Sequence, residues 1–188
     1  MIHFLSSFSG SFLLALLAWP FVAAMITIPI LVGQYRRYNK ILFGRATLIY
    51  FFVFYLIGLA SFTLYPMPDN PQLFCQDYHL VPQLSLFWFL KDIQTNGTVA
   101  ILQVVMNIIL FLPIGFFARI LLRWRFFPTI IGAFLVSLLI ETAQLTGGFG
   151  LYLCSYRLFD VDDLMFNTIG GIIGYLVALF IPRASREG

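Results

Sequence analysis

The stretch FPTIIGAFLVSLLIETAQL, residues 127–145, is an almost wholly apolar run that is long enough to cross a membrane as a helix. A helical crossing of the hydrocarbon core needs about 20 such residues, and four further stretches meet this requirement. We therefore expect an all-α, polytopic membrane helix bundle, built as a single domain over residues 1–188. Its predicted transmembrane spans are residues 11–32, 46–65, 99–118, 128–146 and 164–182.

The composition excludes a water-soluble protein. Of the 188 residues, 61% are hydrophobic and only 10% are charged, whereas soluble domains average about 25% charged residues. The mean hydropathy is +0.93. Because the predicted spans occupy most of the chain, no large soluble domain fits between them.

The basic residues predict how the spans are oriented. All Lys and Arg except Lys91 and Arg157 follow the first, third or fifth predicted span. Since cytoplasmic loops carry the excess of basic residues, the N-terminus is expected outside and the C-terminus in the cytoplasm. The loops 66–98 and 147–163 are then external. The pI near 9.0 reports this topology, so no nucleic-acid partner is expected.

The two predicted external loops carry further signals. Cys75 and Cys154 lie one in each loop, which permits a disulfide in an oxidising exterior or leaves two free thiols. In the first loop, PQLSLFWFLKDI (residues 82–93) has clustered apolar residues. This pattern suits a short helix at the membrane surface, or a loop packed on the bundle.

Three spans carry polar residues at helical spacing. The stripes are Gln103 and Asn107 in the third span, Ser137, Glu141 and Gln144 in the fourth, and Asp163 and Asn167 in the fifth. Spacings of i, i+4 and i+7 put residues on one helical face. A charged side chain facing lipid costs roughly 2.5–3.5 kcal/mol, so such residues usually face a bundle interior or a wet cavity. The stripes therefore predict one shared polar cavity in the outer half of the membrane.

The loop before the fifth span would close the mouth of this cavity with Arg157, Asp160, Asp162 and Asp163. Adjacent acids repel one another unless Arg157 or a cation offsets their charge. Mg²⁺ and Ca²⁺ prefer such oxygen ligands, but the spacing does not match an EF-hand, so we assign no metal ligand and no cofactor.

The same residues allow structural interpretations. An Asp at the start of the fifth span can cap the helix and interact with its dipole, and Glu141 can form an ion pair with Arg157. Asn107 and Asn167 can serve as hydrogen-bond partners between helices. Gly170 and Gly174 have the spacing that allows close helix approach. His79 is either an acid or base or an ordinary polar loop residue.

The polar residues lie in blocks that resemble the VanZ-like family of bacterial membrane proteins. The blocks are NIILFLPIGFF (107–117), SLLIETAQL (137–145) and YRLFDVDDLMFNTIGGIIGY (156–175). HLVPQ (79–83) is similar to the family's NLIPF element, with His79 where Asn is frequent and Gln83 where Phe is frequent. The resemblance, over residues 79–175, implies a bacterial cytoplasmic membrane protein. The family is named for a member associated with low-level resistance to the lipoglycopeptide teicoplanin, and membership implies no particular reaction.

Three functions are compatible with these residues. The preferred hypothesis is an outward-facing pocket that recognises the head group of an envelope lipid or a lipoglycopeptide. A metal-dependent hydrolase or transferase acting on a lipid-linked phosphate, such as a cell-wall precursor, is the enzyme alternative, although no familiar catalytic motif appears and no catalytic residue is assigned. The third alternative is a scaffold for envelope machinery. The expected ligand-binding residues are Glu141, Gln144, Arg157, Asp160, Asp162, Asp163, Asn107, Asn167 and His79.

Overall fold

A computed structural model of the chain describes residues 2–64, 75, 80–155 and 157–181. Its contacts divide the chain into two compact units, Met1–Met67 and Pro68–Gly188, which are taken separately below. Within the described residues, all regular secondary structure is helical apart from one isolated bridge. The predicted all-α fold is therefore confirmed, and the expectation of a single domain stays a prediction.

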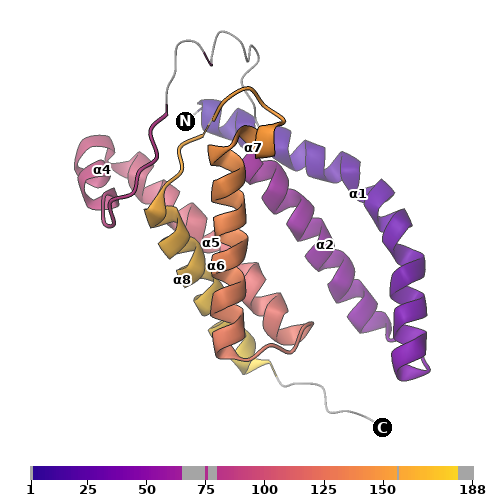
Figure 1. The fold of residues 1–188 in the computed structure, drawn as a ribbon. Coiled ribbons are helices and arrows are strands. Elements are labelled where there is room, and N and C mark those ends of the chain that lie inside the picture. The colour runs from indigo at the N-terminus through magenta and orange to yellow at the C-terminus, as the bar shows by residue number, and fades with distance from the viewer. Residues whose placement is uncertain (1, 65–74, 76–79, 156, 182–188) are drawn as a thin grey trace. The chain divides into compact units, whose positions relative to one another are not determined.

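The first unit is a helical hairpin. Helix α1 (Ile2–Tyr38) is followed, after a short turn, by α2 (Phe43–Leu64). Helix α1 changes direction along its length (Figure 1), as expected for a helix that contains Pro20 and Pro29. In the turn, the side-chain oxygen of Gln34 accepts a hydrogen bond from the backbone N–H of Leu42 at 2.9 Å.

The second unit contains the remaining helices. Three long helices form its body, and Figure 1 shows them side by side. They are α5 (Thr98–Ile120), α6 (Phe126–Leu145) and α8 (Val161–Val177), the last followed by a 3₁₀ turn, η1 (Ala178–Phe180). Two short helices, α4 (Phe89–Asn96) and α7 (Gly147–Gly150), lie in the connections. Of the two possibilities for residues 82–93, a short helix is present over residues 89–93 as the first part of α4, whereas residues 82–88 are not helical.

Helices α5 and α8 approach each other closely because both present glycines at their contact. A Cβ atom built on Gly170 would lie 2.2 Å from the carbonyl oxygen of Ile108, and one on Gly174 would lie 1.8 Å from that of Leu112. Neither position has room for a methyl group. The close approach predicted from the Gly170 and Gly174 spacing is confirmed, and it brings the polar faces of α5 and α8 together.

In the part of the chain that the structure describes, five helices are long and apolar enough to cross a membrane. They span Phe12–Tyr38, Phe43–Leu64, Thr98–Ile120, Phe126–Leu145 and Val161–Phe180, which agrees with the five predicted spans. The largest difference is at the end of the first span, where polar residues continue the helix to Tyr38. The side of the membrane that each loop faces stays a prediction.

Candidate functional site

Polar side chains from α5, α6, α8 and the loop before α8 gather in the second unit. We call this set the polar cluster: Asn107, Ser137, Glu141, Gln144, Asp160, Asp162, Asp163 and Asn167. Glu141 and Asp162 are each only 2% exposed, and Asn167 is 4% exposed. Glu141 therefore faces the interior of the unit, as predicted. Gln103, on the predicted stripe with Asn107, is exposed and takes no part.

The acids of the polar cluster are joined through the backbone. Glu141 Oε2 accepts a hydrogen bond from the N–H of Asp160 at 3.1 Å. Asp160 Oδ1 in turn accepts one from the N–H of Asp162 at 2.8 Å. The two oxygens of Asp162 accept from the N–H groups of Phe87 and Phe89, both at 2.8 Å. One chain of interactions thus links α6, the start of α8 and the segment before α4.

This arrangement decides the roles of two acids. Asp160 is the N-cap of α8, so the capping interpretation of the sequence holds at that position. Asp162 uses both of its oxygens on backbone N–H groups, which leaves it few sites for a ligand. Asp162 holds the segment that carries Phe87 and Phe89, and its expected place among the ligand-binding residues stays a prediction.

The segment before α4 has a second attachment that the sequence did not predict. Gln83 forms a parallel bridge with Asp160, in which the N–H of Gln83 donates to the carbonyl of Phe159 at 2.8 Å and the N–H of Val161 donates to that of Gln83 at 3.1 Å. Backbone contacts of this kind leave no compositional pattern. The only signal was the similarity of HLVPQ to a family element.

Two hydrogen bonds between side chains connect the three long helices. The amide of Asn107 on α5 donates to Asp163 Oδ1 on α8. The amide of Asn167 on α8 donates to the Ser137 hydroxyl on α6 at 2.9 Å. The interhelical bonding considered for both asparagines is therefore present. Ser137 was recognised as part of a polar stripe but not as a site residue.

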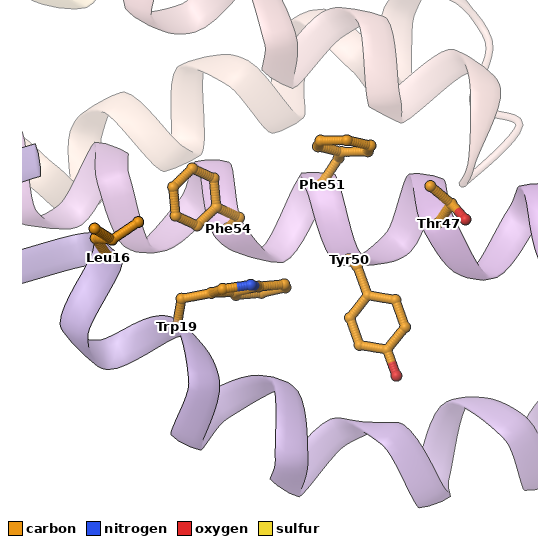
Figure 2. A pocket seen from close by; sticks show the side chains of 6 residues that line it. All are labelled: Leu16, Trp19, Thr47, Tyr50, Phe51 and Phe54. Atoms are coloured by element: carbon orange, nitrogen blue, oxygen red, sulfur yellow. The ribbon is translucent and has the colours of Figure 1, made fainter.

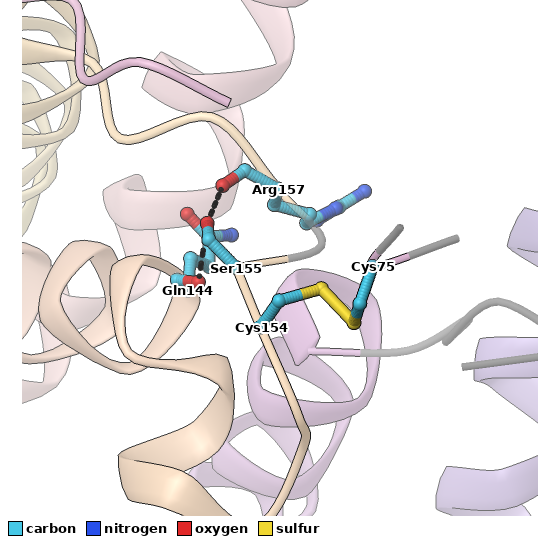
Figure 3. Close-up of a disulfide and its surroundings, with 5 residues drawn as sticks. All are labelled: Cys75, Gln144, Cys154, Ser155 and Arg157. Carbon is cyan, nitrogen blue, oxygen red and sulfur yellow. Dashed lines mark hydrogen bonds between the residues drawn. A yellow bond between two sulfur atoms is a disulfide. The ribbon is translucent and has the colours of Figure 1, made fainter. Parts of the chain in front are cut away.

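Arg157 lies within electrostatic range of the polar cluster. Its positive charge attracts the carboxylates of both Glu141 and Asp163. The two carboxylates repel each other. The local chain is held by Ser155, whose hydroxyl donates to the carbonyl of Arg157 at 2.7 Å and lies 3.1 Å from that of Gln144 (Figure 3). One basic and two acidic side chains thus share this region.

A disulfide joins Cys75 to Cys154, next to Ser155 (Figure 3). Of the two possibilities left by the sequence, the structure has the bridge. It links positions 79 residues apart and ties the first predicted external loop to the second. The disulfide therefore constrains the loop that carries Arg157 and Asp160.

Burial raises the pKa of the Asp160 carboxyl above its ordinary value of 3.8, and the charges of Asp162 and Asp92 raise it further. The hydrogen bond from the N–H of Asp162 acts in the opposite direction. The repulsion expected between neighbouring acids therefore contributes to the higher pKa of Asp160, with burial as the main cause.

No fully buried side-chain nitrogen or oxygen of the polar cluster lacks a hydrogen-bond partner. Among the described residues, the one buried side-chain nitrogen or oxygen that lacks a hydrogen bond is Gln34 Nε2, in the first unit. No group of three or more His, Cys, Asp or Glu with metal-binding geometry occurs in the described ranges, and His79 lies outside them.

Comparison with known proteins assigns the chain to a family. A family model described as VanZ/LLP1 matches residues 52–182. The chain belongs to the VanZ/LLP1 family. No curated protein and no solved structure matches the chain. The VanZ/LLP1 match includes every residue of the polar cluster, and it extends on both sides beyond residues 79–175, where the resemblance was seen. Together with its apolar helices, it identifies a membrane protein with several helical spans.

Proposed function

We propose that the polar cluster, with Arg157, recognises the polar head group of a cell-envelope lipid or lipoglycopeptide at the outer face of the bacterial cytoplasmic membrane. The observation that carries the proposal is the convergence of Glu141, Asp163 and Asn107 from three membrane-spanning helices. Intramembrane ionisable groups are costly, and they usually mark functional sites.

The charges favour a head group that carries charges of both signs. The carboxylates of Glu141 and Asp163 repel each other, and an ammonium or hydroxyl group between them relieves that repulsion. The guanidinium of Arg157 suits a phosphate, which it can bind through two parallel hydrogen bonds. An aminophospholipid head group supplies both groups, and a lipoglycopeptide such as teicoplanin is the second ligand class proposed.

The backbone clamps make this a preorganised site. Glu141 and Asp160 fix the loop, and Asp162 fixes the segment before α4. Groups held in this way lose little conformational freedom when a ligand binds. In the proposal, Glu141, Asp163, Asn107 and Arg157 contact the ligand, whereas the other cluster members hold them in place.

Binding to the detergent-solubilised protein tests the proposal. The probes are dihexanoyl phosphatidylethanolamine, dihexanoyl phosphatidylglycerol and teicoplanin, each titrated by calorimetry. We expect saturable binding of at least one probe. The variant Asp163→Asn keeps the oxygen that accepts from Asn107 but removes the charge, and it should weaken that binding about tenfold or more.

Asp92→Asn is the matched control. Asp92 is a half-buried acid on α4 that accepts a hydrogen bond from Asn96, and its neutralisation should leave the affinity unchanged. Absence of saturable binding by all three probes contradicts the proposal, and so does an equal loss of affinity in the two variants.

A further inference from the structure

The hairpin of α1 and α2 has an apolar cavity of about 410 Å³ that is open at the surface of the unit, where Phe51 is 62% exposed. Its size falls within the range of about 300–1,000 Å³ that is usual for ligand pockets. Figure 2 shows Trp19 from α1 and Tyr50 from α2 in the space between the two helices. The lining residues are Leu16, Trp19, Thr47, Tyr50, Phe51 and Phe54.

The surface of this cavity is suited to hydrocarbon. The four lining residues of α2 recur at i, i+3, i+4 and i+7, so they form one face of the helix. The Trp19 ring meets Tyr50 and Phe54 edge-on, with centroids 5.9 and 5.5 Å away. The Tyr50 hydroxyl is hydrogen-bonded to Thr27 at 2.6 Å, which leaves its aromatic ring as the surface offered to a ligand.

Positive charge gathers at the turn of the same hairpin. The guanidinium groups of Arg37 and Arg45 each lie 5.7 Å from the centroid of the Tyr38 ring, so both cations lie near the same aromatic ring. Thr47, at one end of the cavity lining, follows Arg45 by two residues, a rise of about 3 Å along the helix. Arg36 and Lys40 add further charge in this part of the chain.

The first unit carries a net positive charge, because the sequence has no Asp or Glu before Asp69. The preference for basic residues on the cytoplasmic side explains why such charges lie in this loop. It does not explain the apolar cavity that starts at Thr47, further along the same helix. An apolar cavity next to concentrated positive charge matches a molecule with a hydrocarbon chain and an anionic head.

We propose that the α1–α2 hairpin binds one anionic phospholipid, with its phosphate at Arg37 and Arg45 and an acyl chain in the cavity lined by Trp19. Basic residues near the membrane surface attract anionic lipids, and basic pockets between membrane helices bind their head groups. This site lies in the first unit, and it is distinct from the polar cluster.

Fluorescence quenching of Trp19 tests this site directly. Trp88→Phe and Trp124→Phe leave Trp19 as the only tryptophan of the chain. The protein is placed in vesicles of phosphatidylcholine containing equal fractions of dibrominated phosphatidylglycerol or dibrominated phosphatidylcholine. We expect the anionic brominated lipid to quench Trp19 more strongly. Replacing Arg37 or Arg45 by Gln should lower its relative affinity roughly fivefold for each arginine, whereas Arg123→Gln, outside the hairpin, should not.

Two results would overturn the proposal. Equal quenching by both brominated lipids in the parent protein means that only ordinary bilayer lipid reaches Trp19. Absence of quenching by either lipid means that protein fills the cavity. Circular dichroism and gel filtration check that the arginine variants are folded. If the arginine variants are not folded, the parent protein is tested with added salt, which must reduce its preference for the anionic lipid. A preference that does not change with salt contradicts the site.

Discussion

The carboxylate of Asp162 holds the backbone of Phe87, 75 positions earlier in the chain, through a hydrogen bond of 2.8 Å. Phe87 has a φ of 67°, a left-handed conformation that costs a non-glycine residue about 1–3 kcal/mol. The second carboxylate oxygen of Asp162 accepts from Phe89 at the same distance. Asp162 is therefore the anchor of a strained segment.

Removing this anchor should destabilise the protein. Hydrogen bonds to charged groups contribute about 1.5–3 kcal/mol each, so Asp162→Ala should lower the free energy of unfolding by about 3 kcal/mol or more. Asp162→Asn keeps one acceptor oxygen, so it should lower the free energy of unfolding by less. Thermal unfolding in detergent shows which of the two variants is less stable. Faster hydrogen exchange at the N–H groups of Phe87 and Phe89 shows that the lost stability comes from this segment. Unchanged exchange in Asp162→Ala would contradict the anchoring role.

Asp160 should make stability depend on pH. Its raised pKa means that the native protein binds this proton more tightly than the unfolded chain does. Stability therefore falls as the pH rises from the ordinary aspartate value through the raised native one. Asp160→Asn keeps an oxygen for the N–H of Asp162 but cannot ionise.

Unfolding temperatures of wild type and Asp160→Asn, measured between about pH 4 and pH 8, check this prediction. The variant should gain stability relative to wild type as the pH rises, with little difference at the acidic end. A difference that stays constant, or one that has the opposite sign, rules out the assigned pKa shift.

Gly174 should not accept a side chain. A methyl group there would meet the carbonyl oxygen of Leu112 at 1.8 Å, so Gly174→Ala must push α5 and α8 apart, at a cost of about 1–3 kcal/mol. Gly58 on α2 is a matched control because nothing lies within 4 Å of an added Cβ. Gly58→Ala should be neutral or slightly stabilising. Equal unfolding temperatures for the two variants would show that the α5–α8 contact is looser than described.

The disulfide should stabilise the second unit. Bridges over long loops contribute about 2–4 kcal/mol, and this one joins residues 79 positions apart. The paired variant Cys75→Ser with Cys154→Ser should therefore unfold at a lower temperature than the oxidised protein. Reduced wild type should behave like the variant. Peptide mapping without reductant must recover Cys75 linked to Cys154, and recovery of two free thiols would refute the bridge.

The sequence was sufficient to predict the helices and their polar faces. Hydropathy located the spans because an uninterrupted run of about 20 apolar residues is typical of a helix that crosses a membrane. Helical spacing placed Glu141 on an interior face because a lipid-facing acid is costly. Gly170 and Gly174 predicted that another helix approaches the fifth span closely, and the structure identifies that helix as α5.

The sequence did not predict what the acids bind. Periodicity indicates the face on which Asp162 lies, but not that the backbone of Phe87 reaches it from a loop 75 residues away. The bridge between Gln83 and Asp160 could not be predicted from the sequence either, because it is made by backbone groups, which nearly all residues share. Such long-range contacts depend on how the loops return to the bundle, which local patterns do not encode.

Glu141 links the structural and functional parts of the account. Its carboxylate holds the N–H of Asp160 and is proposed to contact the head group. Glu141→Gln retains an oxygen that can accept from Asp160 but has no charge, whereas Glu141→Ala loses both. The two variants therefore separate the role of the charge from the role of the hydrogen bond.

The affinity of Glu141→Gln for the best-binding probe, measured together with its unfolding temperature, tests the central claim most directly. The account predicts a protein that unfolds close to the wild-type temperature and binds that probe at least about tenfold more weakly. A variant that binds as tightly as wild type would show that the carboxylate at this position serves the fold alone.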